Sequence, residues 1–374
     1  PKADGSEEEL NVTMQRMEIK IKNVPYFGMV GDGVGYIRLS SFTDRAGAEV
    51  KNALQSLEAK GKLKGVILDL RGNPGGLLNE AINVANVFID KNREIVSTKG
   101  KTDEWNKLYY TLNDAVDTKL NMVVLADGGS ASAAEIVSGS LQDYDRAVII
   151  GQKTFGKGLV QSTHSLPYGA KLKVTTAKYY IPSGRCIQAI NYAERNPDGS
   201  VKHIPDSLKV AFKTTNGRQV WDGGGIDPDV VMEPERLSNI SISLLSKNLI
   251  FEYANEYRMK HDKIADAKVF TISDAEYQEF MNWLTKKDYG YSTQSEKAFE
   301  QLKAIVGKEK YIDSTDADLE AMRKTLMHDK ENDLIKEKAQ LKSLLEEEIV
   351  ARYYLGTGRI ESSLKDDKEL KKAI

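Results

Sequence analysis

The apolar positions of the first two thirds of the chain alternate between two patterns. Short apolar runs such as Met122–Ala126 and Ala147–Ile150 have the length of buried strands. Between them, apolar residues recur three or four positions apart, which is typical of helices that bury one face. Strands that alternate with helices predict an α/β core.

Several elements of this core can be predicted from the pattern. In the helix that Thr43 would cap, Val50, Leu54 and Leu57 share one face. Residues 159–181 indicate a strand, a turn and a second strand. The other predicted elements are strands at Leu10–Ile21 and Asp32–Phe42, and helices at Thr43–Lys60, Leu77–Ile89 and about Ser132–Gln142.

The pattern changes after about Pro234. Residues 238–374 lack strand alternation and contain long charged helices, predicted at Thr315–Met327 and Asn332–Leu355, the latter ended by Gly356. In the second helix, leucines fall on one side at Leu334, Leu341 and Leu345. We predict a helical region that packs on the core, and such a region could also support a homo-oligomer.

Three parts of the chain are therefore expected: residues 1–27, a core at 28–235, and a helical region at 236–374. Within the core, the polar stretch 189–223 is expected to form a surface loop, with a turn at Asn196–Gly199.

Composition excludes several classes of function. The 53 basic and 55 acidic residues give a net charge of -2, which does not favour a nucleic-acid partner. The single cysteine, Cys186, allows no intrachain disulfide and no cysteine-rich metal site. No apolar run has the length of a membrane span, and the acidic opening PKADGSEEE does not resemble a signal peptide. We expect neither a metal nor an organic cofactor.

The most informative stretch for chemistry runs from Asn121 to Gln161. After the first apolar run, a Gly-rich turn leads to Ser130 and Ser132 at the start of a predicted helix, where backbone N–H groups are exposed. Lys157 follows the second run, between two glycines and close to Phe155, Leu159 and Val160. A serine needs a base to become a nucleophile, and a neutral, desolvated lysine can serve.

The residue pattern alone leaves three interpretations of this turn open: Ser130 as nucleophile, Ser132 as nucleophile, or no catalytic role. Either serine could be the nucleophile, and taken by itself the stretch more often indicates an ordinary strand-to-helix junction with an N-cap serine. The four histidines lack a motif with an orienting acid, so a Ser-His-Asp triad is disfavoured. GQKTFGKG resembles a phosphate-binding loop, but Gly158 replaces the required Ser or Thr and a strand follows instead of a helix.

A second glycine-rich turn is expected to join the site. GVILDLRGNPGG, from Gly65 to Gly76, is an apolar strand that ends in glycines, before a predicted helix. Glycines at this position allow backbone N–H groups to point into a cleft and stabilise an oxyanion.

GSASAAEIVSGSLQDYDRAVIIGQKTFGKGLVQ resembles the signature of the C-terminal processing peptidases, or tail-specific proteases. The resemblance implies a serine endopeptidase that cleaves protein substrates near their C-termini with a Ser-Lys dyad. It implies a structural role for Asp143. It also implies the following site: Ser132 as nucleophile, Lys157 as general base, Gln161 orienting the lysine, and an oxyanion hole from Gly75 (Gly76 less so) and Ala133.

The same resemblance implies a Clp protease/crotonase-like ββα core and a location in the bacterial cell envelope, in the periplasm. Residues 1–27 resemble the end of a PDZ domain, a module that captures substrate C-termini. Two alternatives are a non-catalytic binder of protein tails on the same fold and, ranked lower, an acyl-CoA enzyme. The presence of both Ser132 and Lys157 favours the peptidase over either.

Overall fold

The computed structural model describes residues 11–19, 21–309, 312–326 and 330–374. They form two compact units. The core unit comprises Arg16–Pro234 together with Asp367–Ile374. The helical unit is built on Glu235–Asp366, and the described residues 11–15 belong with it. The last eight residues, predicted as part of the helical region, are therefore a return segment of the core unit.

A six-stranded sheet organises the core unit, in the order β1-β2-β3-β6-β7-β14. Only β1 and β2 are antiparallel; every other neighbouring pair is parallel. The strands are β1 (Tyr26–Gly31), β2 (Val34–Arg38), β3 (Gly65–Asp69), β6 (Asn121–Ala126), β7 (Val148–Gly151) and β14 (Val230–Val231).

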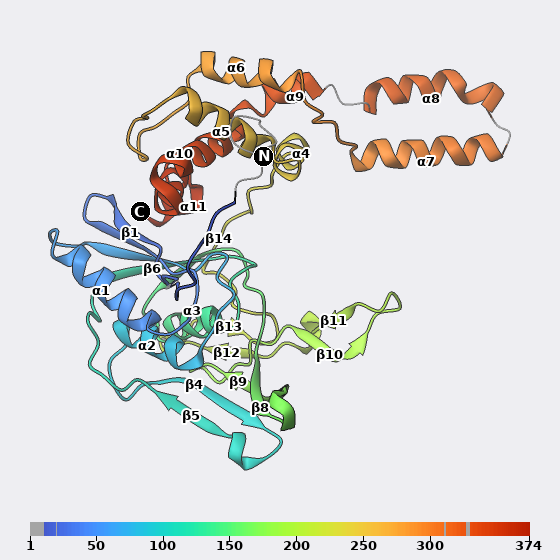
Figure 1. Cartoon of the computed structure of the whole chain (residues 1–374). Coiled ribbons are helices and arrows are strands. Elements are labelled where there is room, and N and C mark those ends of the chain that lie inside the picture. Colours follow the sequence, from blue (N-terminus) through green and yellow to red (C-terminus); the bar gives the residue numbers. More distant parts are fainter. Residues whose placement is uncertain (1–10, 20, 310–311, 327–329) are drawn as a thin grey trace. The chain divides into compact units, whose positions relative to one another are not determined.

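Three helices lie between this sheet and a second, four-stranded sheet (Figure 1). They are α1 (Ala46–Glu58), α2 (Leu78–Phe88) and α3 (Ala133–Asp143). The predicted face of α1 is buried in the shared apolar core, as are the apolar residues of β3 and β6. The second sheet has the order β5-β4-β9-β8, from Lys107–Tyr110, Glu94–Gly100, Lys171–Tyr180 and Leu159–Ser165.

The parallel strands bring three loops to one edge of the six-stranded sheet. Because β3, β6 and β7 run in the same direction, the segments that follow Asp69, Ala126 and Gly151 leave the sheet on the same side. Ligand sites of α/β sheets form at this carboxyl edge. These three loops carry the glycine-rich turn, the two serines and Lys157. The topology therefore brings the predicted site residues to one edge of the sheet.

Two predictions near the start of the chain are wrong. Residues 11–19 of the predicted strand Leu10–Ile21 form no strand, and their apolar side chains are exposed; Leu10 and Lys20 lie outside the described residues. Alternation alone does not make a strand without a partner that accepts its hydrogen bonds. Thr43 does not cap α1, because its N–H and hydroxyl both donate to Asn23 Oδ1, at 2.8 Å each.

The polar stretch 189–223 forms two hairpins instead of an irregular loop. They pair β10 (Ile190–Arg195) with β11 (Val201–His203), and β12 (Ala211–Lys213) with β13 (Gln219–Trp221). The predicted turn at Asn196–Gly199 is confirmed by a hydrogen bond from Gly199 N to Asn196 O of 2.9 Å. Short 3-10 turns complete the unit at Asp103–Trp105, Pro167–Gly169 and Asp206–Leu208.

The helical unit has its own apolar core, which includes the buried side chains of Leu334, Leu341 and Leu345 as predicted. The predicted end at Gly356 coincides with a break in α10: Leu355 has a non-helical φ of 58°, and a second helical stretch continues from there to Ser363. Of the helix predicted at Thr315–Met327, Met327 lies outside the described residues.

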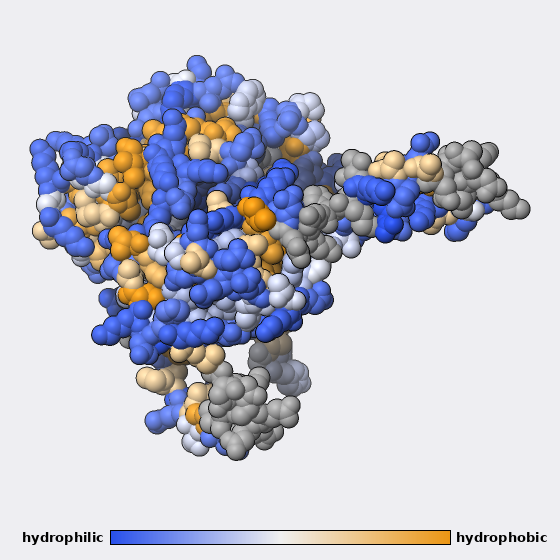
Figure 2. Space-filling view, turned by 90° about the horizontal axis from the view of Figure 1, so that it is seen from above, coloured by the Kyte–Doolittle hydropathy of each residue, from blue (hydrophilic) through white to orange (hydrophobic). Residues whose placement is uncertain are grey.

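The helices of this unit and of the return segment are α4 (Asn239–Ser246), α5 (Leu249–Lys260), α6 (Asp274–Leu284), α7 (Gln294–Lys308), α8 (Ile312–Leu326), α9 (Lys330–Lys336), α10 (Lys338–Ser363) and α11 (Lys368–Ala373). Hydrophilic residues dominate the face drawn in Figure 2, with apolar residues in small groups between them. Among the helices of the described residues, none combines the length and apolarity that a bilayer crossing requires.

Candidate active site

The five site residues predicted from the sequence line one cavity of about 410 Å³. Gly75 comes from the loop after β3, Ser132 and Ala133 from the start of α3, Lys157 from the loop after β7, and Gln161 from β8. Leu77, Ile136 and Val160 supply apolar wall. Lys173 and Tyr179 reach the cavity from β9, and the sequence analysis identified neither.

Ser132 sits at a strained turn. Its φ of 57° and ψ of −114° are unusual for a residue with a Cβ atom. Such conformations persist where the surrounding structure holds them and cluster at functional sites. The turn places the Ser132 side chain in the cavity at the first residue before α3, beside helix N–H groups that have no intrahelical partner.

Ser130 is placed differently, although the sequence did not separate the two serines. Its side chain is completely buried and does not line the cavity. The hydroxyl donates to Leu70 O at 2.8 Å and accepts from Asp127 N at 3.0 Å. Ser130 thus connects the loop after β3 to the loop after β6, which is a structural use of its hydroxyl.

Glu135 joins the loop of Ser132 to the loop of Lys157. Its buried carboxylate accepts from Ser132 N and Lys157 N at 2.8 Å each through Oε2. Through Oε1 it accepts from Thr154 Oγ1 at 2.6 Å and Gly156 N at 2.7 Å. Burial raises the pKa of Glu135 above its ordinary value, against the effect of these four donors. The S-x-x-E spacing of a capping box could have indicated this residue from the sequence.

Lys157 is not buried, contrary to the prediction from its neighbours. Its side chain is exposed, and Phe155 beside it keeps 46% of its surface exposed. Lys157 lies in the loop before β8 and Gln161 lies on β8, and both line the same cavity. No carboxylate of the described residues lies within ion-pair distance of the Lys157 amine.

Tyr179 holds the backbone of this loop and contacts the serine. Its phenol donates a hydrogen bond to Lys157 O, and an interaction with the Ser132 side chain opposes the rise in the pKa of Tyr179. Burial raises the pKa of Tyr179 well above its ordinary value, so the phenol keeps its proton at neutral pH. Among the described residues, Ser132 and Lys157 share no side-chain hydrogen bond.

The predicted oxyanion donors differ in availability. The Ala133 N–H opens α3, and no hydrogen bond of the described residues uses it. The Gly75 N–H donates to Asn73 Oδ1 at 2.9 Å, so it is occupied in this arrangement. No such bond among the described residues uses the Gly76 N–H, which makes Gly76 the more available glycine.

Only glycine fits at position 75. Its φ is 92°, and a Cβ atom there would lie 2.8 Å from Ser132 Cβ and 2.6 Å from Ala131 O. The missing side chain lets the loop after β3 approach the serine turn closely.

Asp143 lies at the other end of α3 and contacts no atom of the cavity. It accepts from Arg185 Nη2 and Ser183 N, at 2.9 Å each, and both members of the Asp143–Arg185 pair are buried. Burial raises the pKa of Asp143, and the Arg185 charge opposes that effect. These contacts support the structural role that the resemblance implied.

Asp69, at the end of β3, holds the start of the loop that carries Gly75. It is fully buried and accepts from Tyr36 Oη at 2.5 Å and Arg71 Nη2 at 2.7 Å. Burial alone would raise the pKa of Asp69, but the hydrogen bond and charge of Arg71 hold it below its ordinary value.

This lowered pKa predicts a loss of stability in acid. The contribution of Asp69 is present above its unfolded pKa of about 3.9 and disappears as pH falls through the lower folded value. Urea unfolding between pH 6 and pH 3 should therefore show a steeper loss for the wild type than for Asp69→Asn. Parallel stability curves for the two proteins would contradict this expectation.

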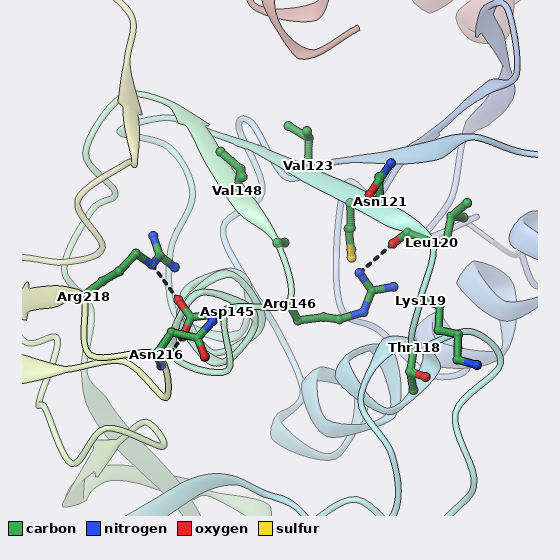
Figure 3. Close-up of a pocket in the computed structure, with 12 residues that line it drawn as sticks. Thr118, Lys119, Leu120, Asn121, Val123, Asp145, Arg146, Val148, Asn216 and Arg218 are labelled. Atoms are coloured by element: carbon green, nitrogen blue, oxygen red, sulfur yellow. Dashed lines mark hydrogen bonds and ion pairs between the residues drawn. The ribbon is translucent and has the colours of Figure 1, made fainter.

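A second cavity of the core unit, of about 710 Å³, lies elsewhere (Figure 3). It is lined by the amino ends of β6 and β7, so it opens at the opposite edge of the sheet from Ser132. Its arginines are already used: Arg146 Nη1 donates to Leu120 O at 2.7 Å, and Arg218 Nε donates to Asp145 at 2.5 Å. We therefore place the chemistry in the smaller cavity.

Within the described residues, no group of three or more His, Cys, Asp or Glu side chains is arranged to hold a metal ion. What the smaller cavity contains is a hydroxyl at a strained turn, an amine without a carboxylate partner, and available N–H groups. These are the parts of a serine nucleophile with a lysine base.

The sequence comparisons agree with this class. Residues 33–199 match the model of peptidase family S41, and residues 240–374 match a family described as a probable PDZ-protease, C-terminal helical domain. The first match contains the three loops of the site. These matches confirm the resemblance to the C-terminal processing peptidases of peptidase family S41.

Individual relatives have matching descriptions. A carboxy-terminal-processing protease of Bartonella bacilliformis is 45% identical over 210 residues, which are 55% of this chain and 47% of that protein. A probable CtpA-like serine protease of Staphylococcus aureus is 42% identical over 186 residues, 49% of this chain and 36% of that protein. This chain thus spans about half or less of the length of these relatives. A solved photosystem II D1 C-terminal processing protease has 30% identity and a TM-score of 0.41, covering 55% of this chain and 43% of that one.

Proposed function

We propose that this chain is a serine endopeptidase that cleaves protein substrates near their C-termini. The observation that carries the proposal is the cavity shared by Ser132 and Lys157, whose amine has no carboxylate partner among the described residues. A lysine without an acid beside it can give up its proton, which a general base must do.

In the proposed reaction, Ser132 Oγ attacks the substrate carbonyl while neutral Lys157 accepts the hydroxyl proton. The oxyanion forms beside the start of α3, where the Ala133 N–H and a glycine N–H of the loop after β3 donate to it. Lys157 then returns the proton to the leaving amine, and water hydrolyses the acyl-enzyme by the same route. Gln161 orients the lysine amine from β8.

This mechanism requires a local rearrangement. Among the described residues no side-chain hydrogen bond joins Ser132 to Lys157, and the Lys157 side chain is exposed. A substrate that fills the cavity would exclude water around the amine and favour its neutral form. We propose that the Ser132–Lys157 contact forms in that step, with Tyr179 continuing to hold the lysine backbone.

We further propose a location in the bacterial cell envelope, in the periplasm, on the ground of the bacterial relatives. We also propose that the chain self-associates through the helical unit. Its helices α7 and α8 leave the apolar side chains of Leu302, Ile305 and Met322 largely exposed.

The proposed function can be tested with unfolded casein and with two peptides of one sequence, one ending in a free carboxylate and one in an amide. We expect the wild type to cut casein, to prefer the free carboxylate, and to lose cleavage in Ser132→Ala. If both proteins bind the free-carboxylate peptide equally and neither cuts, the chain is a binder of protein tails, and the peptidase proposal fails.

We also expect the peptidase activity to increase with pH. Because the base works only when deprotonated, kcat/KM should rise with pH through a single ionisation and then level. Initial rates on the free-carboxylate peptide between pH 5 and pH 10 would measure this, with the folded state followed by circular dichroism. A rate that falls across this range while the protein stays folded would argue against a lysine base.

A further inference from the structure

The return segment Asp367–Ile374 reaches the loops of the candidate active site. Arg71 Nη2 donates to Asp367 Oδ2 at 2.6 Å, and Arg71 Nη1 donates to Glu369 Oε2 at 2.7 Å. The other oxygen of Glu369 accepts from Gln152 Nε2. The three charged side chains are 12–17% exposed, so water screens these pairs only in part.

Glu369 therefore bridges two loops that lie far apart in the sequence. Arg71 begins the glycine-rich turn that leads to Gly75 and Gly76. Gln152 begins the loop that leads to Lys157. A single carboxylate accepts from both, and neither Glu369 nor its two donors are among the residues that line the cavity.

Short hydrogen-bonded paths connect the bridge to the site. After Arg71, Asn73 O accepts from Ala131 N at 2.9 Å, and the Asn73 side chain accepts from Gly75 N. After Gln152, Phe155 N donates to Ser130 O at 3.0 Å, just before Lys157. A displacement of Arg71 or Gln152 would thus shift the glycine donors or the lysine amine.

The return segment is itself held in place. Asp367 caps α11 by accepting from Leu370 N at 2.8 Å, and Leu370 is buried against the core unit. α11 packs against β6 and β7. Arg71 keeps two hydrogen bonds to Asp69 in addition to those with the segment. Removing one carboxylate of the segment would therefore not leave the Arg71 charge unpaired.

We propose that Glu369, supported by Asp367, is a positioning residue for the peptidase reaction, which fixes the separation between the loop of Gly75 and Gly76 and the loop of Lys157. The inference rests on the function proposed above. It assigns the return segment a role in catalysis that is separate from the packing of the helical unit.

The test compares Glu369→Ala, Glu369→Gln and the control Asp366→Asn, which neutralises an exposed carboxylate three residues away. On the free-carboxylate peptide, Glu369→Ala should lower kcat about tenfold or more with little change in KM, because small misplacements of catalytic groups are costly. Glu369→Gln keeps one acceptor oxygen and should lose less. Asp366→Asn should match the wild type.

Hydrogen exchange followed by mass spectrometry provides a readout that needs no catalysis. In Glu369→Ala, peptides that cover residues 71–78 and 152–158 should exchange faster, while those of α1 and β6 are unchanged. Unchanged exchange in both loops overturns the inference. So does a wild-type kcat for Glu369→Ala, or faster exchange throughout the core unit with a kcat that falls only in proportion to unfolding. A wild type that cuts no substrate overturns the proposed function instead.

Discussion

Replacing Ser132 by alanine is expected to abolish proteolysis, with a loss in kcat on the order of 10³-fold or more. The variant would keep the cavity and the N–H donors but have no nucleophile. Lys157→Ala should be equally inactive, and so should Lys157→Arg, because a guanidinium does not give up its proton at neutral pH. Initial rates on unfolded casein, with variant and wild type shown to be equally folded, measure the effect.

Two matched controls make this prediction specific. Ser130→Ala should retain measurable kcat but lose stability of roughly 1–3 kcal/mol, because it leaves the partly buried N–H of Asp127 without its acceptor. Lys153→Ala removes an exposed lysine of the same loop, which pairs with Asp227 at 2.9 Å, and should keep its activity. A Ser132→Ala protein that cleaves at the wild-type rate, or a Lys153→Ala protein as inactive as Lys157→Ala, would contradict the assignment of the dyad.

Replacing Glu135 by alanine is expected to destabilise the core unit by about 4 kcal/mol or more. Four donors would lose one shared acceptor, and each buried donor left unsatisfied costs roughly 1–3 kcal/mol. Glu135→Gln should also be destabilising, because its NH₂ group would face the donors on one side of the former carboxylate. Urea unfolding of the purified proteins gives the free energies.

A glutamate of the same unit provides the comparison. Glu104 is exposed, so Glu104→Ala should change the free energy of unfolding by no more than about 0.5 kcal/mol. If Glu135→Ala unfolds within 1 kcal/mol of the wild type, by the same order-of-magnitude scale, the carboxylate is not the connection that joins the two loops.

The sequence by itself determined the parts of this protein that depend on local pattern. The apolar runs and their periodicity predicted β6, β7, α2 and α3 to within about two residues, because each element buries a face that its own residues specify. The spacing of GSAS and TFGKG was sufficient to identify the family. The order of strands and helices predicted an α/β core and a helical region, which is the architecture observed.

Only the tertiary structure decided which distant segments complete the site. Glycines and apolar neighbours around Lys157 indicated burial, but no segment of the described residues covers its side chain. Tyr179 from β9 and Glu369 from the return segment reach the loops across long sequence separations, which no local period records. Periodicity predicts that the apolar face of a helix or strand will be buried, but it does not predict which residues will bury it. These contacts therefore follow from the packing of the whole unit.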